Sequence, residues 1–181
     1  MRHPADNPVA FAKFIGWLAS GSISCSYCGQ RDAAEGSDPT EFEAMHELSW
    51  CHLWVMADRF KLDELALEVI RQLVKCLWIR TRANPEIFVS KEAVGYVFEN
   101  TVGGTGLRKV MAKEVAHYHL SDIVGKEGFT RLAEYHCGNE EMKAEFEAAA
   151  WQHVHISHIC CAGHWRVPVG CCYSEESLLH Y

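Results

Sequence analysis

The chain has 181 residues, of which 49% are hydrophobic, and carries a formal net charge of -7 at pH 7. This length suffices for one domain with a sizeable core, or for one domain and a tail. The acidic balance argues against an extended nucleic-acid surface, which relies on clustered Lys and Arg. Charged residues interrupt every apolar window, and Asp and Pro occupy the place of a signal-peptide core. We therefore expect a cytoplasmic or nuclear protein without membrane contact.

The first predicted element is a helix that begins at Asn7-Pro8, with Asn as the cap and Pro in the first turn. Its apolar residues recur at helical spacing, and Gly21 is placed to end it; they are Phe11, Phe14, Ile15 and Leu18. From Ser22 to Pro39 the composition shifts to Ser, Gly, Cys, Asp and Glu. This segment is predicted to be a long exposed loop.

A helical hairpin is predicted next, over ELSWCHLWVMADRFKLDELALEVIRQLVKCLW. Its first apolar face stops near Phe60, and Asp63 can cap the second helix. A connection this short makes the two helices neighbours that share a core. The expected core residues are Leu48, Cys51, Leu53, Trp54, Val55 and Ala57, and then Leu65, Ala66, Val69, Ile70, Leu73, Val74 and Leu77.

Three further amphipathic stretches follow, and no segment alternates like a strand. Ser90 opens a helix with Ala93, Val94, Val97 and Phe98 on one side. A glycine-rich turn at 103–106 precedes a helix containing Leu107, Val110, Met111 and Val115. The last stretch, 129–150, carries Leu132, Met142 and Phe146, with Gly138 interrupting it. The predicted fold is mainly α, with units at 5–80 and 84–150 and an irregular, disordered Cys/His-rich tail at 151–181.

Several of these segments resemble a known family. NPVAFAKFIGWLASGSI resembles the third helix of a BTB/POZ domain, and LWVMADRFKLDELALEVIRQL resembles the hairpin after it, with matches at Met56, Ala57, Asp58, Phe60 and Leu65. EAVGYVFENTVGGTGLRKVMAKEVAHYHL is similar to the helical extension of fungal BTB-like proteins, with matches at Tyr96, Glu99, Asn100, Thr101, Leu107 and Arg108. The resemblance covers roughly residues 5 to 150.

The resemblance implies a non-catalytic adaptor or oligomerisation module that contacts a protein partner or a second copy. BTB domains begin with a strand-rich half, which this chain lacks, so we expect a truncated domain. Its exposed surface implies aggregation, a partner that supplies the missing surface or, as the favoured explanation, a truncated gene model. The first helix should then expose an apolar patch. The expected contact residues are Phe11, Phe14, Trp17 and Trp78. Recruitment of a cullin-type ligase scaffold is weakly supported, because SGSISCSYCGQ lacks the hydrophobic-x-Glu element that often mediates it.

Two groups of Cys and His residues suggest zinc. Cys25-Ser26-Tyr27-Cys28-Gly29 has the form of a zinc knuckle, but its loop holds no further ligands, so reduced thiols are the favoured interpretation. In the tail, His158, Cys161, His164 and Cys171 have ligand-type side chains at plausible spacing. A zinc-binding module built on this tail is the alternative function, and an accessory tail without a metal role is the favoured one.

No pattern predicts a catalytic site, so we expect no catalytic residues, no required cofactor and no enzyme activity. Cys51-His52 and His136-Cys137 are sequence neighbours, which point about 100° apart on a helix and cannot face each other as a nucleophile and its base. The glycines at 103–106 lack the phosphate-loop spacing and fit a turn between helices.

Overall fold

A computed structural model describes the backbone of residues 7–25, 39–83, 89–122 and 138–160, and the side chains of residues 7–25, 45–77, 89–116 and 138–150. This part of the chain holds six helices and no strand: α1 (Pro8–Ser20), α2 (Pro39–Arg59), α3 (Asp63–Ala83), α4 (Lys91–Asn100), α5 (Gly106–Asp122) and α7 (Glu140–Cys160). The prediction of a mainly α fold is confirmed for these residues.

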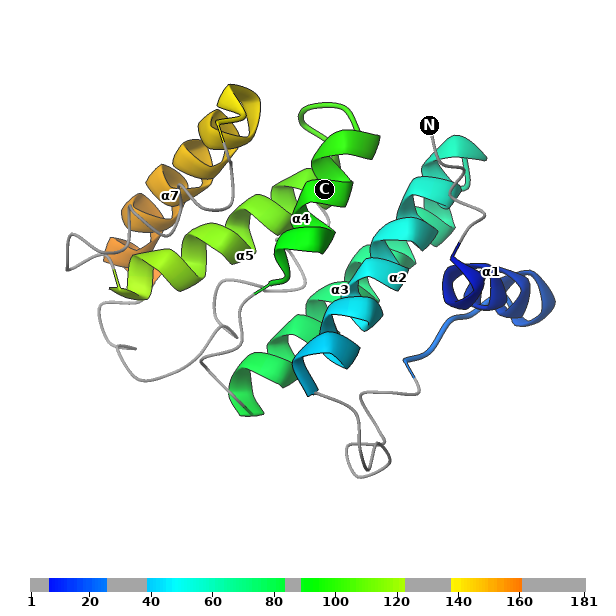
Figure 1. Ribbon diagram of the computed structural model, residues 1–181. Coiled ribbons are helices and arrows are strands. Elements are labelled where there is room, and N and C mark those ends of the chain that lie inside the picture. The colour runs from blue at the N-terminus through cyan, green and yellow to red at the C-terminus, as the bar shows by residue number, and fades with distance from the viewer. Residues whose placement is uncertain (1–6, 26–38, 84–88, 123–137, 161–181) are drawn as a thin grey trace.

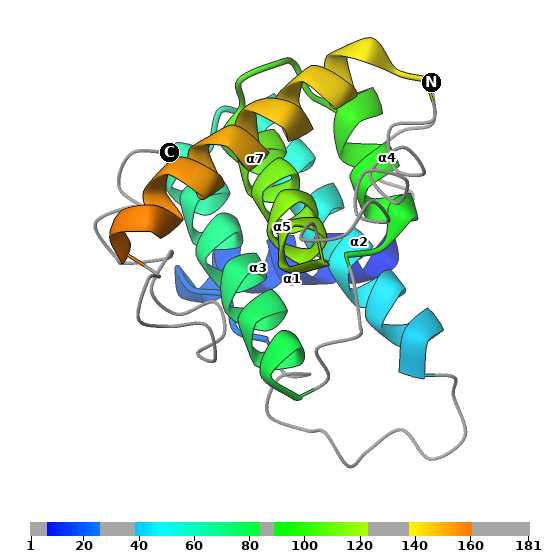
Figure 2. The ribbon, with the colours of Figure 1, turned by 90° about the vertical axis from the view of Figure 1, so that its left-hand side faces the viewer.

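The α2–α3 hairpin forms the centre of the molecule (Figure 1). Helix α4 packs on α2, and α5 packs on α3 and α4, while α7 covers α5 on the outer side. Helix α1 contacts α2 on the opposite side of the hairpin, and in Figure 2 it lies behind the hairpin as seen from the α7 side. Helix α1 is therefore an outer element attached to one face of the bundle.

The helix ends follow the chemistry that the sequence predicts. Asn7 caps α1 by accepting a hydrogen bond from the Ala10 amide at 3.0 Å, and Gly21 ends the helix in the left-handed region at φ 70°. Ser90 caps α4 in the same way through the Ala93 amide at 3.1 Å. These caps satisfy amide groups that would otherwise lack a partner in the first helical turn.

A three-residue turn joins α2 to α3. The Leu62 amide donates to the Ala57 carbonyl at 2.9 Å, and Lys61 adopts φ 56° to let the chain reverse. Because the turn is this short, the two helices must lie against each other along their length. The predicted hairpin is confirmed.

A single apolar cluster connects the helices. It includes nearly all of the predicted core residues, among them Cys51, Trp54, Leu73, Val97 and Phe146. Leu48 and Ala66 are only half-buried. Trp50 is also fully buried, which makes it one of the largest side chains in the core.

Two segments differ from their predicted structure. Residues 22–25 have no regular secondary structure, as predicted, and Ser22 and Ser24 are exposed. Ile23 is nevertheless buried and Cys25 half-buried, because the chain turns at Gly21 and returns across the hairpin. Helix α7 continues ten residues past the predicted boundary at Ala150 and ends at Cys160. The whole of this helix contains neither Gly nor Pro, so nothing in its sequence interrupts it there. None of the described helices has the length and apolar character needed to cross a membrane.

Candidate functional site

Helix α1 is apolar around most of its circumference. Its only charged residue is Lys13, and Ala10 is its only buried residue. Phe14 and Trp17 pack partly against the core, whereas the remaining large apolar side chains face solvent: Val9, Phe11, Ile15 and Leu18 are 48–58% exposed. A helix that is hydrophobic on all sides is normally buried. Helix α1 therefore presents a surface of the kind that proteins usually cover.

The exposed surface of α1 continues onto the hairpin turn through aromatic contacts. Phe14 lies 6.5 Å from Phe11 and stacks on Phe60, with ring centroids 5.9 Å apart and planes at 17°. Phe60 is itself 57% exposed. We call Phe11, Phe14, Ile15, Leu18 and Phe60 the α1 face. It combines aliphatic and aromatic side chains from two elements.

The only charged side chain of α1, Lys13, is directed toward α2. Lys13 Nζ donates a hydrogen bond to Ser49 Oγ at 2.8 Å and lies 3.6 Å from the centroid of the Trp50 ring. Both partners are buried residues of α2. The usual arrangement of a surface helix is thus partly reversed, because the ammonium group faces the hairpin while Val9, Phe11, Ile15 and Leu18 face outward.

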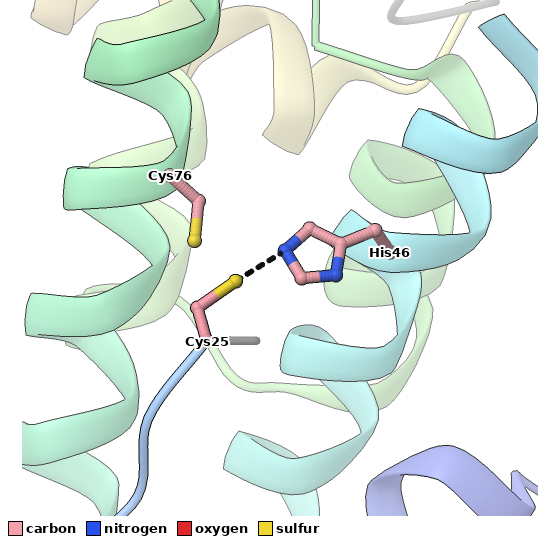
Figure 3. Close-up of side chains that lie close together, drawn as sticks. All are labelled: Cys25, His46 and Cys76. Atoms are coloured by element: carbon pink, nitrogen blue, oxygen red, sulfur yellow. Dashed lines mark hydrogen bonds between the residues drawn. The ribbon is translucent and has the colours of Figure 1, made fainter. Parts of the chain in front are cut away.

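A second cluster joins three segments of the chain near the end of α1. Cys25 follows α1, His46 belongs to α2 and Cys76 belongs to α3, and their ligand atoms all lie within 4.8 Å of one another. Cys25 Sγ is 3.2 Å from His46 Nε2, and the Cys76 sulfur points toward the same space (Figure 3). We call these three residues the Cys/His cluster. Its sulfur and imidazole side chains have the chemistry that suits a metal ion such as zinc.

Trp50 connects the Cys/His cluster to α1. Its indole N–H donates to His46 Nε2 at 3.1 Å, and the two rings meet edge to face. The same indole carries Lys13 on its face. A buried aromatic residue therefore contacts the docking group of α1 on one side and a potential metal ligand on the other.

The remaining described residues do not assemble a nucleophile and base around Cys51. Burial raises the pKa of the Cys51 thiol far above its ordinary value, so the thiolate that acts as the nucleophile is disfavoured. The His52 ring packs on Tyr96, with centroids 3.9 Å apart. Cys51 is a core residue, as predicted.

Arg108 holds the α4–α5 turn to α7. Its side chain is 3% exposed and pairs with Glu141 at 2.6 Å and Glu145 at 3.1 Å, while Nη2 donates to the Phe98 carbonyl at 2.8 Å. Nε donates to Thr101 Oγ1 at 3.0 Å. Thr101 and Arg108 are thus in direct contact across the turn. Their arrangement is structural, since every guanidinium nitrogen has a protein partner.

Only some of the predicted site residues lie in the part of the chain whose side chains the structure describes. Phe11 is exposed, and Phe14 and Trp17 are half-buried, so the three lie on or beside the α1 face. The backbone of Trp78 is in α3 and that of His158 in α7, but their side chains are outside the described set. Cys28, Cys161, His164 and Cys171 are outside the described residues altogether. Spacing along the sequence did not reveal the Cys/His cluster, because its ligands come from separate segments.

The function of the chain has to be argued from its fold, the α1 face and the Cys/His cluster. No family model matches the chain, no curated protein matches it, and no solved structure matches it.

Proposed function

We propose that this protein is a non-catalytic interaction module that associates with a second copy of itself through the α1 face. The observation that carries this proposal is the orientation of α1, in which Lys13 is turned inward while four large apolar side chains are turned outward. Covering such a patch is favourable because apolar surface leaves water. Aromatic side chains, which the α1 face contains, are enriched in the centres of protein interfaces.

The backbone of α1 also suits contact with another helix. Ala12 and Gly16 are exposed and four residues apart, and a Cβ added at Gly16 would meet no atom within 4 Å. Small residues at this spacing allow a neighbouring helix to approach closely beside Ile15. Because a two-fold pair uses the same patch on both copies, α1 of one chain can cover α1 of the other.

The resemblance to BTB/POZ domains supports the same proposal. In that family the third helix packs against other parts of the domain, and the domain serves as a dimerisation and adaptor module. Helix α1 here has the sequence features of that helix, and its outer face is uncovered in the described part of the chain. We therefore assign a BTB-type interaction role to this surface as part of the proposal.

The strength of the association follows from the exposed side chains. Phe11, Ile15 and Leu18 are each about half exposed, and burying the exposed half of such a side chain is worth about 1 kcal/mol. Association itself costs about 4–15 kcal/mol in lost freedom. The contact should therefore be weak and depend on protein concentration, as in a transient module.

Sedimentation velocity over a range of concentrations tests this proposal. The wild-type chain should shift from monomer toward dimer as concentration rises, and Ile15→Asp and Leu18→Glu should each remove the shift. The matched control is Val102→Asp, which adds the same charge at an apolar residue that is 74% exposed in the turn after α4. A wild-type chain that stays monomeric at every concentration, or a control that behaves like the α1 variants, would refute self-association.

A further inference from the structure

We propose that Cys25, His46 and Cys76 form a binding site for a single Zn²⁺ ion. This proposal rests on other observations than those that carry the interaction role of α1. Two sulfurs and one imidazole nitrogen are a ligand set that zinc prefers, whereas Ca²⁺ and Mg²⁺ require oxygen ligands. The set comes from three segments that the fold brings together, so it is a consequence of the tertiary structure.

The distances within the cluster fit tetrahedral coordination. With Zn–S bonds of about 2.3 Å and a Zn–N bond of about 2.0 Å, two sulfurs lie about 3.8 Å apart and a sulfur and a nitrogen about 3.5 Å apart. The three ligand atoms lie within 4.8 Å of one another, and Cys25 Sγ is 3.2 Å from His46 Nε2. Side-chain movements smaller than the length of a bond bring them to these distances. The direction of the three side chains in Figure 3 agrees with this geometry.

The charges within the site also balance. Zinc binding replaces the thiol protons of Cys25 and Cys76, which pass to solvent, and two thiolates neutralise the charge of the ion. A neutral centre suits this location, because Cys76 is 6% exposed and the other two ligands are half-buried. Water can occupy the fourth position of a zinc ion held by three protein ligands.

Trp50 supplies a hydrogen-bond donor beside the ligands. Its indole N–H donates to His46 Nε2 in the structure. When that nitrogen binds the ion, the indole N–H loses this acceptor, and a zinc-bound thiolate is an acceptor of suitable chemistry. Donors of this kind orient the ligands of metal sites.

The ion would link the segment after α1 to both helices of the hairpin. Cys25 is held near the hairpin by the burial of Ile23, two residues earlier. Zinc would add bonds from this segment to α2 and α3, and its binding free energy would contribute to the stability of the fold. The inferred effect of the ion is therefore to stabilise the packing of this segment on the hairpin.

Metal analysis of the full-length chain tests the site. The tail has ligand-type side chains of its own, so the background protein carries His158→Ala, Cys161→Ser, His164→Ala and Cys171→Ser. After dialysis under reducing conditions against a weak chelator, it should retain about one zinc per chain. Cys25→Ser, His46→Gln and Cys76→Ser should each lose the zinc, and the control Cys51→Ala, at a cysteine outside the cluster, should retain it.

A second measurement avoids any change to the cluster. Cobalt added to the metal-free background protein should produce the charge-transfer absorption of thiolate-bound Co²⁺. This absorption should stop rising when one Co²⁺ has been added per chain. Zinc absent from the background protein, zinc retained by both cysteine variants, or cobalt spectra without thiolate absorption would each overturn the proposal. A Cys25–Cys76 disulfide that persists in the reducing buffer and excludes zinc would also overturn it.

Discussion

Replacing Arg108 tests how the outer helices are held together. Its guanidinium group donates to the Phe98 carbonyl and to Thr101, and it pairs with Glu141 and Glu145 of α7. Arg108→Met keeps an unbranched apolar stem and removes all of these bonds. Arg108→Lys keeps the charge but lacks the planar fork that reaches several partners at once.

The expected loss of stability has two main sources. The buried Phe98 carbonyl loses its donor, and the ion pairs with Glu141 and Glu145, which are partly removed from water, are broken. Removing one partner of a buried charge pair costs about 3–5 kcal/mol. The lower end applies here because Glu141 is 59% exposed and returns to water easily, whereas Glu145 is 21% exposed. We expect Arg108→Met to lower the free energy of unfolding by about 3 kcal/mol, which corresponds to a fall in Tm of about 6–12 °C. Arg108→Lys should lose about half as much.

Equilibrium urea denaturation, followed by circular dichroism, measures these changes. The matched control is Lys143→Met, which removes a partly exposed cation that lies 3.6 Å from the exposed Glu140 on α7. Exposed pairs contribute little, so this variant should change the free energy of unfolding by less than about 0.5 kcal/mol. If Arg108→Met is no less stable than Lys143→Met, the argument that Arg108 holds α4, α5 and α7 together is wrong.

Three further predictions concern single residues. Burial raises the pKa of Tyr96 from 10.0 to about 12, so the unfolded chain loses this proton first and stability falls as the pH rises from 10 to 12. Tyr96→Phe should remove this part of the loss of stability at alkaline pH when denaturation is measured against pH, and an unchanged pH profile would contradict the argument. A Cβ added at Gly95 in α4 meets open space, so Gly95→Ala should raise the free energy of unfolding by about 0.5–1 kcal/mol. Gly104 has φ 78°, so Gly104→Ala should lower the free energy of unfolding by about 1 kcal/mol. Denaturation midpoints that move in the same direction for both variants would refute this. Cys51 should resist alkylation at pH 8 until denaturant is added, and fast native labelling detected by mass spectrometry would contradict its burial.

The helices could be predicted because their determinants are local. Asn7 and Ser90 are caps, Gly21 is a helix end, and the apolar spacing around Leu73 identifies a buried face. Each of these signals acts within one or two turns of helix. The identity of the buried faces followed from the same spacing, since the two helices of a short hairpin must share a core.

The two candidate sites depend on contacts that are distant in sequence. His46 and Cys76 carry no local motif, and Cys25 belongs to a polar segment that predicts an exposed loop. Only the return of the chain across the hairpin brings the three together. Likewise, an apolar patch on the first helix was expected, but the inward direction of Lys13 was not, because its hydrogen-bond partner on α2 is 36 residues away.

Trp50 links α1 and the Cys/His cluster through a single side chain. One indole ring meets Lys13 on its face and His46 at its N–H, so any shift of the ring alters the docking of α1 and the geometry of the Cys/His cluster together. Binding free energies that are coupled in this way are reciprocal. An ion that changed the affinity of one copy for another by a given factor would have its own affinity changed by the same factor. Metal titrations at low and high protein concentration would then give different dissociation constants.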